Sequence, residues 1–184
     1  MRRMVTVMAV AAMFLTLGPP ATADEIVCRG EIGRRTVDDV KVPQGATCTL
    51  SGTQVEGNVK INRNATLIAV NVQVDGNVQG ENAKNVVVRA GSVVGGDVQV
   101  VQGNRARVIG SRVGGDILYD EQDGRVVVKR TKVGGNVQAF QNTGGVVIKN
   151  NRIDGNLQCK ENEPRPVGGG NRVEGDKEDQ CSRL

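Results

Sequence analysis

The chain of 184 residues contains no histidine and no tryptophan, and aromatic residues make up only 2% of it. Without histidine, the Ser-His and Cys-His pairs that activate a nucleophile cannot form, and the commonest general base is missing. The densest acidic group, Asp120, Glu121 and Asp123, falls in an expected turn and does not recur elsewhere. We therefore expect no catalytic site, no cofactor and no metal site.

Long hydrophobic runs are also scarce, and only Met4–Leu17 is sustained. Two arginines precede it, and Gly-Pro-Pro and then Ala21-Thr22-Ala23 follow, a small-x-small pattern typical of signal-peptide cleavage. The alternative is a membrane anchor, but this run would rise only about 21 Å as a helix, less than the roughly 30 Å of a hydrocarbon core. We predict a signal peptide at 1–23 and no membrane span. The mature chain, 24–184, is expected to be secreted, either extracellular or associated with the cell wall.

Glycine and valine, by contrast, are abundant and regularly spaced. A pattern of a β-branched residue, any residue, Gly, Asn or Asp, usually an aliphatic residue and often Gln occurs seven times. Its glycines are Gly57, Gly76, Gly96, Gly115, Gly135, Gly155 and Gly175, separated by 19 or 20 residues. A second apolar run follows each of the first five glycines, and Gly- and Asn-rich turns separate the two runs. This period predicts an all-β fold, a right-handed parallel β-helix of 19–20 residues per coil with six to seven coils and capped ends.

Two other folds share parts of this pattern. Leucine-rich repeats have a similar period but need leucine at several fixed positions, and an antiparallel sandwich would not keep the Gly-Asn/Asp register. We expect an N-terminal cap and first partial coil at 24–54, the β-helix repeats at 55–176 and a C-terminal cap or tail at 177–184. Lys177 marks this end because earlier coils carry an aliphatic residue at its position.

The four cysteines are spaced by about one period. Cys28 and Cys48 are 20 residues apart, and Cys159 and Cys181 are 22 apart. Residues one period apart lie on adjacent coils, about 4.8 Å from each other, which suits a disulfide. Export also favours oxidised cysteines. The spacing therefore predicts one disulfide at each end of the solenoid, with four free thiols as the alternative.

Stacked coils turn each repeat position into a column on the surface. The Asn or Asp after each glycine predicts a hydrogen-bonded ladder, with a row of cation ligands as the alternative. The period of about 20 residues does not fit the nine-residue Ca²⁺-binding repeats. The recurring glutamines Gln79, Gln99, Gln138 and Gln158 indicate amide stacking between strands.

A basic column is the one candidate binding feature. Three residues before the glycine, successive coils carry Arg112, Lys132, Arg152 and Arg172, and Lys129 and Lys149 are expected nearby. Stacked like charges cost stability unless they are offset, and we expect Asp154 to offset Arg152 and Glu174 to offset Arg172. The column predicts contact with an acidic cell-wall polymer or glycan, and the alternative is a solvated basic face. Nucleic acid is not expected, because export and the lack of a stacking series of aromatics argue against it.

The Val-x-Gly-Asn/Asp-Val pattern over 55–171 resembles the coils of bactofilins, which are cytoplasmic bacterial β-helix proteins that polymerise end to end. The mature chain more closely resembles small secreted actinobacterial β-solenoid proteins of unknown function, which share the leader and the segment Val42-Pro43-Gln44-Gly45-Ala46-Thr47-Cys48. That resemblance implies a secreted, non-catalytic structural or binding protein, which we expect to be a monomer. Two alternatives stay open: a glycan-active β-helix enzyme of the polysaccharide lyase or hydrolase type, and a self-assembling bactofilin-like surface protein.

Overall fold

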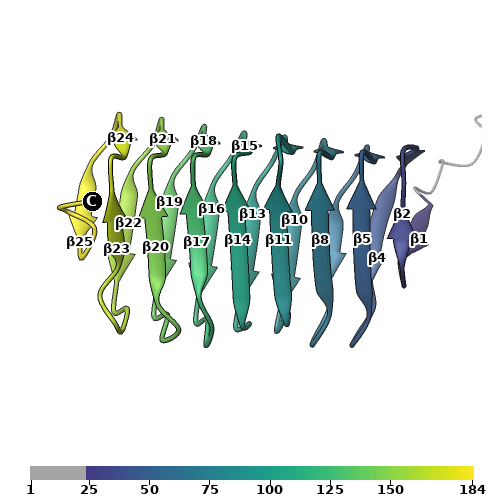
Figure 1. Cartoon of the computed structure of the whole chain (residues 1–184), viewed down its shortest axis with the longest axis horizontal. Coiled ribbons are helices and arrows are strands. Elements are labelled where there is room, and N and C mark those ends of the chain that lie inside the picture. The colour runs from purple at the N-terminus through teal and green to yellow at the C-terminus, as the bar shows by residue number, and fades with distance from the viewer. Residues whose placement is uncertain (1–23) are drawn as a thin grey trace, which may run out of the picture.

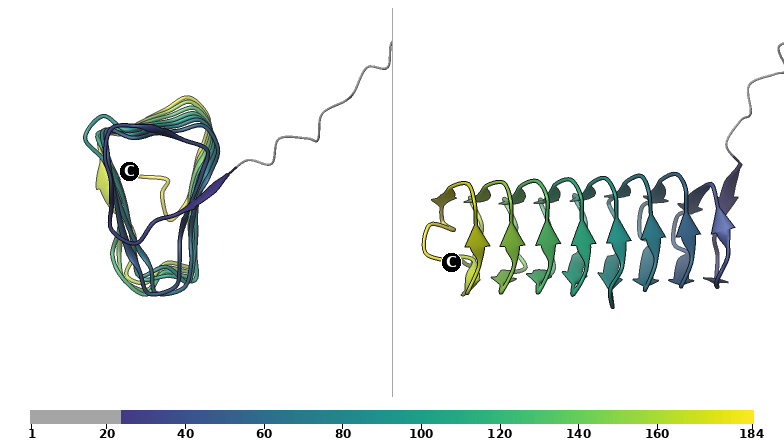
Figure 2. Two further views of the ribbon diagram at one scale, coloured as in Figure 1. Left: turned by 90° about the vertical axis from the view of Figure 1, so that its right-hand side faces the viewer. Right: turned by 90° about the horizontal axis from the view of Figure 1, so that it is seen from above.

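The computed structural model describes residues 24–184, and this part of the chain contains β-strands and no helix. The predicted signal peptide at 1–23 lies outside the described residues. The strands form three sheets in which each strand pairs in parallel with its counterpart one coil away (Figure 1). The chain visits the three sheets in turn, and its cross-section is three-sided (Figure 2).

Sheet A contains nine strands: β1 (Glu25–Val27), β4 (Asp39–Val42), β7 (Val59–Ile61), β10 (Val78–Glu81), β13 (Val98–Val101), β16 (Ile117–Asp120), β19 (Val137–Phe140), β22 (Leu157–Lys160) and β25 (Lys177–Asp179). Sheet B contains eight: β2 (Glu31–Ile32), β5 (Thr47–Ser51), β8 (Thr66–Val70), β11 (Asn85–Arg89), β14 (Arg105–Ile109), β17 (Val126–Lys129), β20 (Val146–Lys149) and β23 (Val167–Gly169). Sheet C contains eight short strands: β3 (Thr36–Val37), β6 (Gln54–Val55), β9 (Gln73–Val74), β12 (Val93–Val94), β15 (Arg112–Val113), β18 (Lys132–Val133), β21 (Arg152–Ile153) and β24 (Arg172–Val173).

The coil is right-handed, as the sequence predicted. In Figure 1 the chain runs up sheet B at the front, crosses sheet C at the top and descends through sheet A behind, while it advances from right to left. From β2 to β23 it passes sheet B eight times and so completes about seven turns. The predicted all-β parallel solenoid is therefore confirmed.

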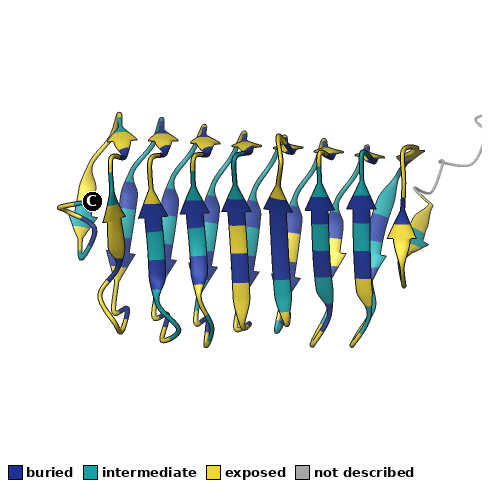
Figure 3. Ribbon diagram, viewed as in Figure 1, coloured by how far each residue is buried: buried dark blue, intermediate teal, exposed yellow. Residues whose placement is uncertain are grey.

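The core fills the inside of the coil with aliphatic side chains. Residues alternate along each strand, so that Val59 and Ile61 of β7 are buried while Lys60 between them is exposed. The same alternation recurs in coil after coil, which gives the banded burial in Figure 3. Tyr119 is the one aromatic residue in this described core: it is 1% exposed, and its hydroxyl has no hydrogen-bond partner.

A ladder of side-chain hydrogen bonds runs along the corner between sheets C and A. The Oδ1 atom of each Asn or Asp accepts the backbone N–H of its counterpart on the next coil, at 2.6–2.9 Å. The rungs are Asp39, Asn58, Asn77, Asp97, Asp116, Asn136 and Asn156, ending on the N–H of Asp176. The predicted ladder is confirmed, and it begins one coil before the first full repeat.

The glycine of the repeat is required for space. A Cβ atom built at Gly135 would meet Asp116 Oδ1 and the backbone carbonyl of Gly115 on the preceding coil. The neighbouring motif glycines meet the preceding rung in the same way. Glycine therefore lets consecutive coils approach closely enough for the ladder to form.

In the later coils, buried amides form ladders at the other two corners as well. Between sheets A and B, the N–H of Gln122 donates to Asn142 Oδ1 at 3.0 Å. Between sheets B and C, the N–H of Thr131 donates to Asn151 Oδ1, also at 3.0 Å. Here the accepting side chain belongs to the following coil, whereas in the first ladder it belongs to the preceding coil. Each coil is thus bonded through side chains to both of its neighbours.

Disulfides lie near both ends, in the pairing that the spacing predicted. Cys28, between β1 and β2, is joined to Cys48 of β5 with a Cα–Cα distance of 5.5 Å, and Cys159 of β22 is joined to Cys181 at 5.2 Å. After β25 the chain turns inward across the open end of the coil (Figure 2). Leu184 packs against the core, and Gln180 Oε1 accepts the N–H of Asn162 at 2.9 Å. This C-terminal cap covers apolar side chains that an open end would expose.

Candidate polyanion-binding surface

The densest acidic group of the sequence lies at the end of β16 in sheet A and in the segment that follows it. Within residues 24–184, no group of three or more His, Cys, Asp or Glu side chains is arranged to hold a metal ion. Asp120 lies on the outer face of sheet A between Val101 and Phe140 on the neighbouring strands. Burial, and secondarily the negative charge of Glu121, raise the pKa of Asp120. The sequence predicted a turn for the whole group, but Asp120 is the last residue of β16 and only Glu121 and Asp123 lie in the segment that follows it.

The basic column predicted from the repeat lies on sheet C. Its four members begin β15, β18, β21 and β24, and each is the register partner of the next: Arg112, Lys132, Arg152 and Arg172. All four residues are exposed. The column therefore stands on one face with its charges one coil apart, about 4.8 Å.

Acidic neighbours neutralise one member of the column. Arg152 Nε lies 3.2 Å from Asp154 Oδ1, and Arg152 Nη2 lies 2.6 Å from Glu174 Oε1. The expectation that Glu174 offsets Arg172 on its own coil was wrong, because the Glu174 side chain reaches across to the preceding coil. No ion pair involves Arg112, Lys132 or Arg172 within the described residues.

Lys129 and Lys149 lie on a different face from the column. They end β17 and β20 of sheet B and are register partners of each other. The turn through Arg130 and Thr131 separates Lys129 from Lys132. The predicted set is therefore divided by the corner between sheets B and C, with four residues on one side and two on the other.

Sheet B brings Lys129 together with three arginines that the repeat pattern had not singled out. A shallow groove of about 490 Å³ is lined by Arg105, Arg107, Ile109, Arg125, Val127, Lys129 and Val147. Arg107, Val127 and Val147 are register partners in successive strands, so the valines form a floor along the axis of the solenoid. Arg105 and Arg125 lie toward one end of the strands and Lys129 toward the other.

The positive charges of the groove are not balanced by neighbouring acidic side chains. No acidic residue lines it, and no ion pair involves Arg105, Arg107, Arg125, Lys129 or Lys149 within residues 24–184. Stacked like charges on neighbouring strands are destabilising. The fold gains nothing evident from this arrangement, which makes the groove the better candidate for an anionic ligand.

A signal for the arginines was present in the sequence. In Arg105-Ala106-Arg107-Val108, polar and apolar residues alternate, and the structure buries Ala106 and Val108 while exposing both arginines. That alternation predicts a half-buried strand with a basic outer face. The register of the seven glycines predicts which residues stack on sheet C, but it does not align the arginines of sheet B.

No helix in residues 24–184 has the length and apolar character needed to cross a membrane. Comparisons of the chain with protein-family models, with curated proteins and with solved structures find no match.

Proposed function

We propose that the protein is a secreted, non-catalytic β-solenoid that binds an acidic polymer of the cell exterior, such as a cell-wall polymer or an acidic glycan. The predicted signal peptide and the two disulfides support an oxidising location outside the cytoplasm. The rigid rod of stacked coils supports a structural or binding role, because its outer faces present side chains at fixed intervals.

The cationic groove on sheet B is the observation that carries the proposal. Its guanidinium and ammonium groups flank a floor of Val127 and Val147, both half-buried. An acidic sugar chain has anionic groups for the basic side chains and apolar C–H faces for the valines. Arg105 and Arg125 stand about one strand spacing, roughly 4.8 Å, apart along the axis, as do Lys129 and Lys149, so a linear polymer can meet successive charges.

The surroundings favour a polysaccharide over other polyanions. Tyr119 and Phe140 belong to strands of sheet A, so sheet B offers no aromatic platform for the bases of a single-stranded nucleic acid. The groove on sheet B is concave, which suits an extended polysaccharide chain lying along it. The column on sheet C is a secondary contact, because Arg152 is already paired with Asp154 and Glu174.

The test is a comparison of three triple variants with equal changes in charge. Arg105→Ala/Arg107→Ala/Arg125→Ala removes the groove, Arg112→Ala/Lys132→Ala/Arg152→Ala removes the column, and Arg29→Ala/Arg35→Ala/Arg63→Ala removes three exposed arginines elsewhere. Affinity for polygalacturonate is measured by calorimetry at two salt concentrations. We expect the affinity of the groove variant to fall roughly tenfold or more, since each exposed ion pair contributes up to about 1 kcal/mol, and the affinity of the column variant to fall less.

The control variant should bind within about twofold of the unaltered protein if only local charge matters. Equal losses in all three variants would show that net charge alone attracts the polymer and would contradict a specific surface. Release of unsaturated or reducing ends from a panel of acidic polysaccharides would contradict the non-catalytic assignment.

A further inference from the structure

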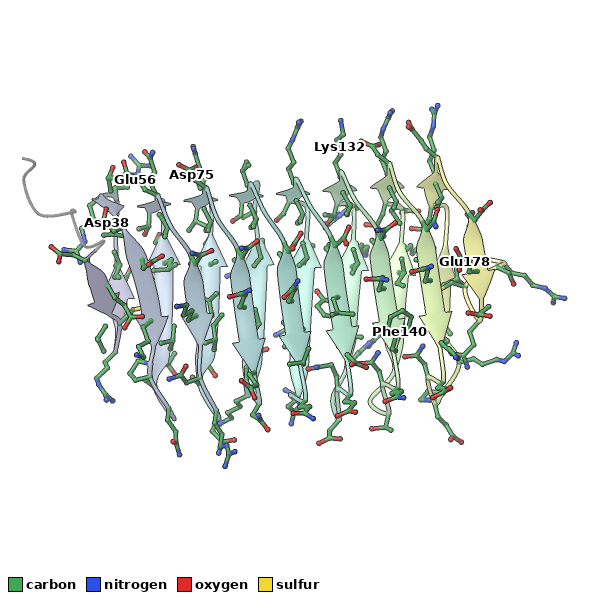
Figure 4. The ribbon with its side chains drawn as sticks, turned by 180° about the vertical axis from the view of Figure 1, so that it is seen from behind. Asp38, Glu56, Asp75, Lys132, Phe140 and Glu178 are labelled. Atoms are coloured by element: carbon green, nitrogen blue, oxygen red, sulfur yellow. A yellow bond between two sulfur atoms is a disulfide. The ribbon has the colours of Figure 1, made fainter. Side chains whose placement is uncertain are left out.

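Over the five consecutive coils from β6 to β18, the outer rim of sheet C changes from acidic to basic, and beyond them Asp154 and Glu174 lie beside Arg152 and Arg172. Two parallel rows of side chains run along it, two residues apart in each coil. The first row contains Gln54, Gln73, Val93, Arg112 and Lys132. The second contains Glu56, Asp75, Gly95, Gly114 and Gly134. Figure 4 shows Glu56 and Asp75 on the same edge of the rod as Lys132, toward the opposite end.

The four charged side chains nearest the middle of the rim are free to contact a partner. Glu56, Asp75, Arg112 and Lys132 are all exposed, and none takes part in an ion pair within the described residues. Asp75 accepts a hydrogen bond from Gln73 Nε2 at 2.9 Å, which holds its carboxylate on the rim. The middle of the rim therefore presents two acids and two bases that have no ion-pair partner among residues 24–184.

An apolar residue marks the midpoint of the pattern. Val93 is 39% exposed, an unusual position for a large aliphatic side chain in this structure. Its strand, β12, pairs with β9 on the acidic side and with β15 on the basic side. Asp75 is thus one coil from Val93 in one direction, and Arg112 is one coil from it in the other. Glu56 and Lys132 are each two coils away.

We propose that this rim is a self-association surface whose partner is a second copy of the chain, lying antiparallel with a two-fold axis at Val93. The axis lies in the interface, across the rods, so each row faces the same row of the other copy. Val93 then meets Val93 of the partner subunit. Arg112 lies diagonally opposite Asp75 of the partner subunit, and Lys132 lies diagonally opposite Glu56 of the partner subunit.

The glycines of the second row make room for these contacts. Under the two-fold rotation, Gly114 faces Asp75 of the partner subunit and Gly134 faces Glu56 of the partner subunit. Because neither glycine has a side chain, the opposing carboxylate can approach and be reached by the Arg112 or Lys132 side chain beside it. A parallel arrangement would place acids against acids and bases against bases, which is unfavourable.

The strands of sheet C are only two residues long, so the contact is narrow. It should bury less than the roughly 800 Å² per partner of a standard interface, and we expect weak association that salt weakens further. Sheet B stays uncovered in this arrangement, so the polymer-binding groove and the rim can be tested independently.

The test uses charge reversals on both sides of the axis. Asp75→Arg and Arg112→Asp should each lower the association constant of the secreted protein about tenfold or more at low salt, because each creates two repulsive contacts per dimer. An equimolar mixture of the two variants should recover association, since Arg at position 75 of one then faces Asp at position 112 of the other. Sedimentation velocity over a concentration series measures this.

Glu81→Arg, an exposed reversal on sheet A, is the matched control and should leave the association constant unchanged. Val93→Glu should also weaken association, and a thermal melt of each variant establishes that it is folded. The proposal is overturned if the unaltered protein is a monomer at every concentration at low salt. It is equally overturned if mixing the two reversal variants does not restore association.

Discussion

Asn58 Oδ1 accepts the backbone N–H of Asn77, one coil further along, at 2.9 Å. Asn77 Oδ1 in turn accepts the N–H of Asp97 at 2.7 Å, so one residue is both the donor of one rung and the acceptor of the next. This continuity makes the ladder a property of the whole corner and gives the first prediction.

Asn77→Ala should lower the free energy of unfolding by about 1–2 kcal/mol, because it leaves the part-buried N–H of Asp97 without an acceptor. Asn77→Asp should cost less, since Asp97 and Asp116 already serve as rungs. Denaturant unfolding measures both. Gln44→Ala in an exposed turn is the control, and an equal effect there would contradict a role for the rung.

Gly135→Ala should destabilise the solenoid by several kcal/mol, at least about 2, because its Cβ would collide with Asp116 Oδ1 and the preceding backbone. Gly30→Ala is the matched substitution, since a Cβ there meets nothing within 4 Å. It should be neutral or stabilising by up to about 1 kcal/mol through the unfolded state. Similar melting temperatures for the two variants would show that the motif glycine is not needed for close approach.

Tyr119→Phe should be neutral or raise the free energy of unfolding by about 1 kcal/mol, because it removes a buried hydroxyl that has no partner. The same burial raises the pKa of the Tyr119 phenol. Tyr119→Ala should instead cost about 3–5 kcal/mol by leaving a cavity. Chemical denaturation compares the two, and a marked loss of stability in Tyr119→Phe would reveal a hydrogen bond to the hydroxyl.

Asp120→Asn should stabilise the protein at neutral pH. The folded-state pKa of Asp120 is raised by burial and by Glu121, so the charged carboxylate is disfavoured in the folded state. Stability therefore falls as pH rises through the carboxyl range, and the asparagine escapes this loss. Melting temperatures from about pH 3 to pH 7 should diverge with increasing pH. A difference that is constant with pH would have another cause.

Cys159→Ser/Cys181→Ser should lower the free energy of unfolding by about 3 kcal/mol, the value expected for closing a loop of this size. It should also release the tail that packs Leu184 against the core. Hydrogen exchange should then show the amides of β22 and β25 opening before those of β13. Unchanged protection at the C-terminal end would mean that the cap holds without its disulfide.

The fold could be predicted from the sequence because a single repeated glycine fixes the register of every coil. Cys28 and Cys48, one period apart, had to lie on adjacent coils, and the same reasoning placed Arg112 beside Lys132. The repeat pattern did not predict Asp39 as the first rung of the ladder, because the stretch from Val37 to Val40 is one residue shorter than the matching stretch from Val55 to Val59.

The candidate site was less predictable, for two physical reasons. The distance from the motif glycine to the inward residue of sheet B increases by one between Ala106 and Val126, which are register partners, so the repeat alone does not give the outward face. Glu174 pairs with Arg152 because its long side chain extends to the preceding coil, and the spacing of residues in the sequence does not encode that reach.

Because the side-chain rungs at all three corners join residues on adjacent coils, the solenoid has no long-range specification of its own length. Removing or duplicating a whole 20-residue unit would leave each remaining residue with an equivalent neighbour, whereas inserting one residue in a strand would turn its core side chains outward. The rod can therefore lengthen or shorten by whole coils, each of which changes its length by about 4.8 Å. The number of coils in this architecture is therefore largely independent of the contacts that fold each coil.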